Sequence, residues 1–139
     1  MKAAAVVLAA AALTAACASS SEKGSSTAAP QTSLTVEVRA DENAAPQQAT
    51  LKCDGTSVGT GFLAGDAARK ACAAVAAPAA AAYLRNPEPQ GQVCTQIFSG
   101  PERAHVSGTL AGQTIDAQLG RSNGCETAGW ELLKPLLQP

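Results

Sequence analysis

Cysteine is the residue type in this chain with the most chemistry to offer. Five are present: Cys17, Cys53, Cys72, Cys94 and Cys125. None of them has the close Cys-x-x-Cys spacing of a zinc site, so the sequence predicts no metal centre. In an exported protein cysteines are expected to pair as disulfides, and the odd total leaves one over. Four cysteines allow three pairings, and the sequence alone does not choose between them.

Cys17 follows a segment with the features of a secretory signal. Residues 1–16 carry one positive charge and then an uncharged apolar run, too short to cross a bilayer of about 30 Å as a helix. The sequence LTAAC at positions 13–17 resembles the lipobox of bacterial lipoproteins, in which the cysteine is lipid-modified and becomes the N-terminus. Ordinary cleavage after Ala18 is the alternative, because Ala-Cys-Ala also fits a small-x-small site. We expect a lipidated Cys17 and a protein outside the cell or anchored on the outer surface of the cell membrane.

The side chains from which enzymes build active sites are few and scattered. His105 is the single histidine, and no carboxylate or nucleophile has a motif relation to it, so we expect a solvated strand residue. Glu126 and Glu131 are expected to be solvated charges rather than a catalytic pair. With no glycine-rich phosphate loop and no metal cluster, the sequence predicts no enzyme and no cofactor.

Charge and composition exclude two further classes of partner. The net charge is −1, and the ten lysines and arginines are spread along the chain. Nucleic-acid binding needs a basic face that displaces counterions, and a polybasic membrane patch needs a similar cluster, so neither is expected. Much of the hydrophobic content is alanine, which buries little area, so the thin core would gain from covalent cross-links.

The apolar pattern divides the chain into a tether and one folded domain. Residues 17–33 are mostly serine, alanine and threonine, which predicts a flexible tether. The domain is expected over residues 34–139. Its first apolar–polar alternation, at 34–38, predicts a half-buried strand, and a second strand is predicted at 49–53. The glycine-rich segment 55–65 is predicted to be a loop.

A helix and a hairpin follow. Asp66 can cap a helix over residues 67–77, which Pro78 ends or kinks, with a further turn through Tyr83. The hairpin strands are predicted at 103–110 and 113–120, joined by Ala-Gly. The sequence SNGC at 122–125 predicts another turn, and the type of the apolar C-terminal stretch stays open. These elements predict an α+β fold in which a sheet packs on helices.

The order of these features resembles the Streptomyces subtilisin inhibitor family of secreted serine protease inhibitors. The resemblance spans residues 34–130. It rests on the surroundings of the four cysteines: LKC at 51–53, a glycine-rich loop, a helix bearing Cys72, VC at 93–94, Pro101, a hairpin, and SNGCE at 122–126. It implies an antiparallel sheet of about five strands with one or two helices on one face. It also implies the disulfides Cys53–Cys72 and Cys94–Cys125, and a homodimer packed sheet to sheet.

The resemblance also implies a functional loop at residues 94–98. In the family these residues are exposed and enter a subtilisin-like serine endopeptidase as a substrate does. The reactive bond is then Gln96–Ile97, flanked by Thr95 and Phe98, with Gln96 in the primary specificity pocket of the enzyme. Such a loop inhibits because it is held extended, which lowers the ordering entropy lost on binding.

Two supports of this loop are implied by the same resemblance. Cys94 is anchored through its disulfide with Cys125. Asn123 matches the asparagine that hydrogen-bonds the loop from behind.

The loop departs from the family pattern. The family commonly has proline after the cysteine and methionine or lysine at the specificity position, where this chain has Thr95 and Gln96. The loop is also one residue longer through Gly100, so we expect it to be looser. Neutral Gln96 suits a broad subtilisin-like pocket better than a trypsin-like one. The alternative function is a non-inhibitory surface lipoprotein that uses the same fold as a binding or structural module.

Overall fold

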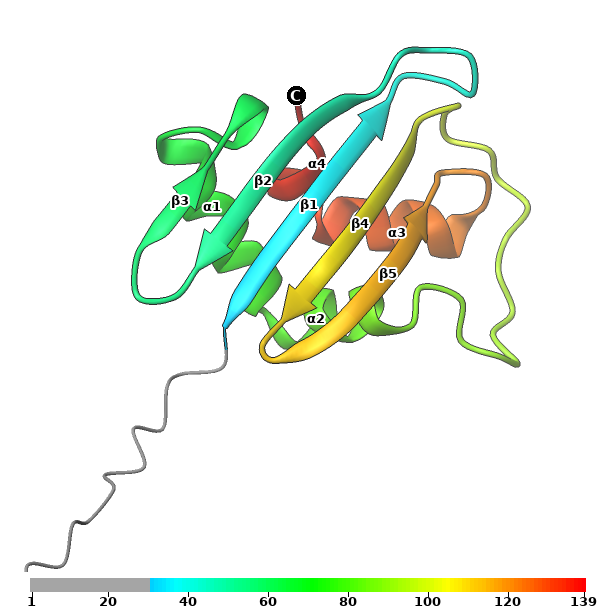
Figure 1. Ribbon diagram of the computed structural model, residues 1–139. Coiled ribbons are helices and arrows are strands. Elements are labelled where there is room, and N and C mark those ends of the chain that lie inside the picture. Colours follow the sequence, from blue (N-terminus) through cyan, green and yellow to red (C-terminus); the bar gives the residue numbers. More distant parts are fainter. Residues whose placement is uncertain (1–30) are drawn as a thin grey trace, which may run out of the picture.

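A computed structural model describes residues 31–139, which form one antiparallel five-stranded sheet with helices on one face (Figure 1). The elements in chain order are β1 (Thr32–Arg39), β2 (Gln47–Cys53), β3 (Ser57–Gly59), the 3-10 helix η1 (Gly61–Leu63), α1 (Asp66–Ala76), α2 (Pro78–Arg85), β4 (Arg103–Leu110), β5 (Gln113–Leu119), α3 (Gly124–Leu132) and α4 (Lys134–Leu137). The strand order is β3-β2-β1-β4-β5. The predicted α+β fold is confirmed. The predicted signal peptide, Cys17 and the tether up to residue 30 lie outside the described residues.

The sheet begins two residues earlier than predicted. Thr32 is buried and pairs with Cys53 on β2, and its hydroxyl accepts a hydrogen bond from the Ala111 N–H at 2.9 Å. The Gln31 carbonyl accepts another from the Gly112 N–H at 2.9 Å. Polar residues at the start of β1 therefore belong to the domain, because the hairpin between β4 and β5 supplies partners for them.

Alternation along the strands buries one face of the sheet. Val36 lies opposite Ala49 on β2 and Val106 on β4, and Val106 lies opposite Ala117 on β5. All four side chains are buried, and they form a row of small residues across the centre of the sheet. Larger side chains from the helical layer, Leu63, Leu84, Leu133, Leu136 and Leu137, fill the space behind it. Each fully buried leucine or valine contributes about 1.5–3 kcal/mol of hydrophobic stabilisation.

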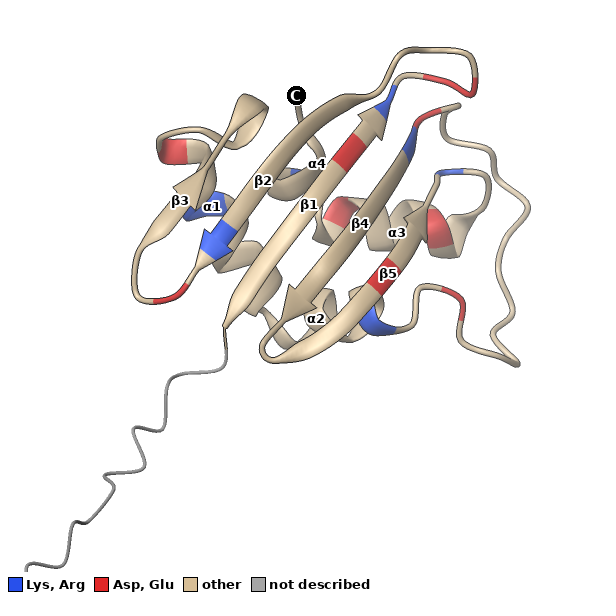
Figure 2. Ribbon diagram, viewed as in Figure 1, with Lys and Arg blue, Asp and Glu red and all other residues tan. Residues whose placement is uncertain are grey.

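The opposite face of the sheet is polar. Thr35 and Glu37 on β1, Thr50 on β2, and His105 on β4 alternate with the buried residues and point away from the helices. Lysines, arginines and acids are scattered over the described residues and form no basic stripe (Figure 2). No helix among residues 31–139 is long and apolar enough to cross a membrane.

Pro78 divides the helical segment after η1, as the sequence predicts. Ala77 is extended (φ −64°, ψ 131°), and Pro78 is the first residue of α2, where its missing N–H costs no hydrogen bond. The predicted cap is wrong, because Gly65 is the N-cap of α1 and Asp66 is its first helical residue. The Asp66 carboxylate pairs with Arg69 instead of capping the helix.

Four elements extend the predicted set. Strand β3 and helix η1 lie inside the segment predicted to be a glycine-rich loop; neither is long enough to show a period. Helix α3 begins at Gly124, inside the predicted turn at 122–125. The open C-terminal stretch is helical, and α4 packs against α1 with Leu136 buried.

Candidate functional site

Residues 92–100, the exposed loop, contain no helix or strand and connect α2 to β4 around the β5 side of the sheet (Figure 1). Residues 89–101 carry no charged side chain. Val93 is 96% exposed, Ile97 63% and Phe98 64%. These are three of the five large hydrophobic side chains that are exposed in the described residues. Apolar side chains gathered on one exposed segment are typical of a surface that binds a partner.

The upstream end of the exposed loop is fixed to the start of α3. The disulfide Cys94–Cys125 joins them, and the implied pairing of Cys53 with Cys72 is also present. Beside the Cys94–Cys125 disulfide, the Gly124 N–H donates a hydrogen bond to the Thr95 carbonyl at 2.9 Å. One covalent bond and one hydrogen bond therefore hold two successive residues of the loop.

The downstream end is fixed to the segment after β5. The Ser99 N–H donates to the Arg121 carbonyl at 2.9 Å, and Gly100 is buried. Between the two attachments, Gln96, Ile97 and Phe98 make no hydrogen bond to any described residue. The three residues that span and follow the predicted reactive bond thus form an exposed stretch held at both ends, with their peptide groups free for a partner.

The side chain of Asn123, which the resemblance assigns to the support of the loop, caps α3. Its Oδ1 accepts hydrogen bonds from the N–H groups of Cys125 and Glu126, both at 3.0 Å, and its Nδ2 donates to Glu126 Oε1 at 3.1 Å. Asparagine is a preferred N-cap because these N–H groups have no partner within the helix. None of the three bonds reaches the loop, so the implied hydrogen bond from Asn123 to the loop is not made. In the described residues Asn123 stabilises the start of α3, to which Cys94 and Thr95 are attached.

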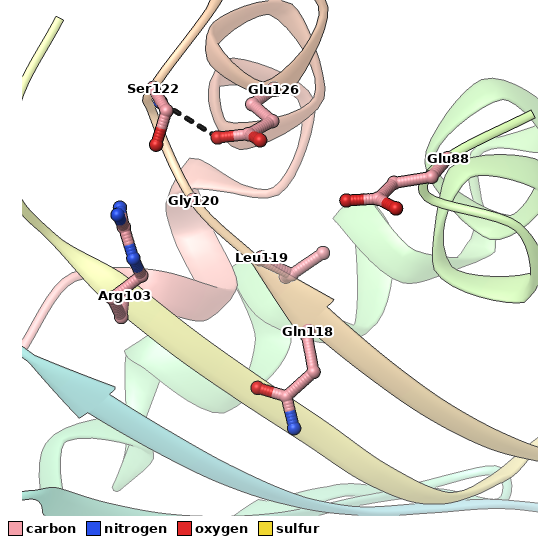
Figure 3. A pocket seen from close by; sticks show the side chains of 7 residues that line it. All are labelled: Glu88, Arg103, Gln118, Leu119, Gly120, Ser122 and Glu126. Carbon is pink, nitrogen blue, oxygen red and sulfur yellow. Dashed lines mark hydrogen bonds between the residues drawn. The ribbon is translucent and has the colours of Figure 1, made fainter.

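A polar cavity of about 280 Å³ lies beside residues 120–126, which run from the end of β5 into the first turn of α3 (Figure 3). It is lined by Glu88, Arg103, Gln118, Leu119, Gly120, Ser122 and Glu126. Glu126 Oε2 accepts from the Ser122 N–H at 2.7 Å, and a Cβ at Gly120 would lie 2.7 Å from the same oxygen. Glu126 binds the backbone N–H of Ser122, and the Ser122 hydroxyl makes no hydrogen bond to a described residue, so the lining shows no paired nucleophile and base. Its polar groups stabilise the 120–124 segment to which both ends of the exposed loop are attached.

His105 lies on the polar face of the sheet and not at the exposed loop. Its Nε2 is 2.7 Å from Asp116 Oδ1, and its Nδ1 is 3.9 Å from Glu37 Oε2. Sequence reasoning missed these carboxylate neighbours, because they come from adjacent strands. No hydroxyl or thiol of the described residues bonds to the ring, so the His105–Asp116 pair has no nucleophile to activate.

Sequence reasoning also missed Val93 and Arg121. Val93 stands three residues before Gln96 and is the most exposed large hydrophobic residue described. An apolar residue directly before a cysteine in an uncharged segment is the signal that could have identified it. The role of Arg121 depends on partners that are distant in sequence.

Comparisons with known proteins add no further assignment. The chain matches no model of a protein family, and no curated protein is significantly similar to it.

Proposed function

We propose that the protein inhibits a subtilisin-like serine endopeptidase by offering the exposed loop as a substrate that stays bound. The observation that carries this proposal is the stretch 96–98, exposed and free of internal hydrogen bonds, between two attachments at Thr95 and Ser99. An extended peptide binds by main-chain hydrogen bonds, while alternate side chains supply specificity. Because the loop is already attached at both ends, it has less conformational freedom to lose on binding.

Each exposed side chain then has a place in the complex. Gln96 enters the primary specificity pocket, and the amide favours a broad pocket over one that carries a carboxylate. Ile97 and Phe98 present apolar area just after the reactive bond, and Val93 presents apolar area before it. A target with apolar subsites on both sides of the reactive bond fits this uncharged loop best.

The attachments also account for inhibition after cleavage. Hydrolysis of Gln96–Ile97 releases a carboxylate on Gln96 and an amine on Ile97. The upstream fragment stays attached through Cys94 and Thr95, and the downstream fragment through Ser99. The two ends remain at a high effective concentration, so the peptide bond re-forms instead of the fragments separating.

We also propose that Cys17 carries the lipid anchor and that the domain is displayed on the outer surface of the cell. The position of the loop supports this. The chain enters the domain at Gln31, which bonds to the turn before β5, whereas the loop is attached to residues after β5. Strand β5 lies between the two points and has seven residues, so at about 3.4 Å per residue it separates them by about 24 Å. An anchor at one end leaves the loop accessible at the other (Figure 1).

The implied sheet-to-sheet homodimer stays a prediction. The face available for it carries Thr35, Glu37, Thr50 and His105, so its interface would be hydrogen-bonded rather than a continuous apolar core. Sedimentation equilibrium of the purified protein measures the association directly.

Active-site titration of subtilisin tests the proposed function. The oxidised protein is added in steps to a known concentration of enzyme, and hydrolysis of a peptide substrate is measured. We expect activity to fall linearly to zero at one loop per active site. The alternative function, a non-inhibitory surface module, predicts that activity stays constant and that the loop is either untouched or simply digested.

A further inference from the structure

Arg121 contacts the downstream part of the exposed loop with its backbone and its side chain. Its carbonyl accepts from the Ser99 N–H at 2.9 Å, and its Nη1 lies 3.0 Å from Glu102 Oε1. Ser99 and Glu102 bracket Gly100-Pro101. One residue therefore binds both ends of the turn by which the loop returns to β4.

The Arg121 side chain connects this turn to the core. Its guanidinium lies 6.0 Å from the centroid of the Trp130 ring, within the range of a cation–π interaction. Trp130 belongs to α3 and is only 7% exposed. The contact thus joins the turn to the helix whose first residues hold the upstream end of the loop.

The Arg121–Glu102 pair is better shielded than the other arginine and lysine ion pairs of the described residues. Its side chains are 22% and 35% exposed, against 71% and 77% for Arg69–Asp66. Shielded charges are screened less by salt and water than exposed ones. Arg121 Nε and Glu102 Oε2 are buried with no partner in the described residues, and the bond between Nη1 and Oε1 is the one side-chain hydrogen bond that either group makes there. Removing either charge would therefore leave the other without its partner.

Gly100 makes room for this pair. A Cβ at Gly100 would overlap the Glu102 carboxylate and lie 3.2 Å from Arg121 Nη1. The sequence suggested that the extra residue loosens the loop. In the structure Gly100 is buried and closes the turn over the ion pair.

We propose that Arg121 is a positioning residue for the exposed loop, acting through Glu102 and Trp130 in the supporting role that the family resemblance gives to Asn123. This inference rests on the proposed function. Its effect falls on the downstream side of Gln96–Ile97. When the protease attacks the Gln96 carbonyl, an acyl-enzyme forms and the Ile97 amine is the leaving group. Because Ser99 is held two residues away, the amine stays near the acyl group, attacks it and re-forms the peptide bond.

Arg121→Gln and Glu102→Gln test the inference in the full-length oxidised protein. The first readout is the rate at which catalytic amounts of subtilisin cleave Gln96–Ile97, followed by mass spectrometry. The second, which needs no protease, is hydrogen exchange of the Ser99 N–H, the loop amide that bonds to the Arg121 carbonyl. We expect both rates to rise about tenfold or more, the effect of losing a charged hydrogen bond. Arg121→Lys keeps the charge and should restore part of the protection.

Two controls separate positioning from general loss of stability. Arg69→Gln removes the exposed ion pair on α1 and should leave both rates unchanged. Leu136→Ala destabilises the core far from the turn and should lower the melting temperature without speeding cleavage or local exchange.

Hydrogen exchange keeps this test distinct from that of the proposed function. If the wild-type protein inhibits no protease, the proposed function fails, yet loss of Ser99 protection in Arg121→Gln still supports the positioning role. Unchanged exchange of the Ser99 N–H in both Arg121→Gln and Glu102→Gln would overturn the inference. An equal rise in exchange in Leu136→Ala would also overturn it, because the effect of Arg121→Gln and Glu102→Gln would then be general destabilisation.

Discussion

The Gly124 N–H donates a hydrogen bond to the Thr95 carbonyl, and the Thr95 hydroxyl occupies the space that a side chain on residue 124 would need. A larger residue at position 124 would overlap the exposed loop, which explains the glycine at the first helical position of α3. This contact connects the identity of one residue in α3 to the position of the residue that precedes Gln96.

Gly124→Ala should displace the loop without destabilising the helix. Alanine is a better helix former than glycine, so the melting temperature should stay the same or rise. Its Cβ overlaps Thr95 Oγ1, so the bond to the Thr95 carbonyl should weaken and exchange of the residue 124 N–H should increase. Thr95→Ala removes the overlapping hydroxyl, and the double variant should regain the protection of the wild type. Equal exchange in Gly124→Ala and the wild type would contradict the described contact.

The two disulfides should have similar effects on stability and different effects on the loop. They span 19 and 31 residues, so replacing the pair Cys53–Cys72 with serines should cost about 3 kcal/mol and replacing Cys94–Cys125 about 4 kcal/mol. Denaturant unfolding measures both losses. Only the second replacement should speed cleavage of Gln96–Ile97 under conditions in which both variants are folded. Equal cleavage of the two variants would show that the Cys94–Cys125 bond does not constrain the loop.

The C-terminal segment should behave as part of the core. Leu136 is fully buried, so Leu136→Ala should lower the free energy of unfolding by about 2–5 kcal/mol. Leu132 is 45% exposed, and Leu132→Ala should change it by no more than about 0.5 kcal/mol. Denaturant titration of the two variants compares the same substitution on neighbouring helices. A similar effect of both would contradict the placement of α4.

Tyr83 should titrate abnormally. Burial, followed by repulsion from Glu126 and Glu88, raises its pKa to about 12 from 10.0. Because the folded protein favours the neutral phenol, this contribution to stability is complete below about pH 10 and is lost between pH 10 and 12. Tyr83 is the single tyrosine, so rapid-mixing measurements of phenolate absorbance report on it alone. A midpoint near 10 in the folded protein would contradict the packing of its ring against Gly129 on α3.

The parts of the fold that the sequence predicted are those in which local chemistry and tertiary environment agree. The alternation at 34–38 survives in β1 because one face of that strand is buried and the other is polar. Pro78 separates α1 from α2 because a proline lacks the N–H that a continuous helix requires. The disulfide pairing came from the family resemblance and not from cysteine counting, which left three possibilities.

The parts that were missed depend on distant partners or on ambiguous local signals. Asn123-Gly124 favours a turn as well as a helix start, since asparagine side chains bond to nearby N–H groups in both. Strand β3 is too short for a pattern and exists because β2 supplies its hydrogen-bond partners. Arg121 and Glu102 are 19 residues apart, and nothing in the sequence pairs them before the strands between them are placed.

Transfer of specificity by one residue tests the central claim most directly. Gln96→Lys and the matched control Gln92→Lys each add the same charge to the exposed loop, but only the first changes the residue proposed for the specificity pocket. Each variant is titrated against trypsin, whose pocket prefers a cation. We predict stoichiometric inhibition by Gln96→Lys and none by Gln92→Lys or the wild type. No inhibition by a folded, disulfide-bonded Gln96→Lys, or equal inhibition by both variants, would contradict a reactive bond at Gln96–Ile97.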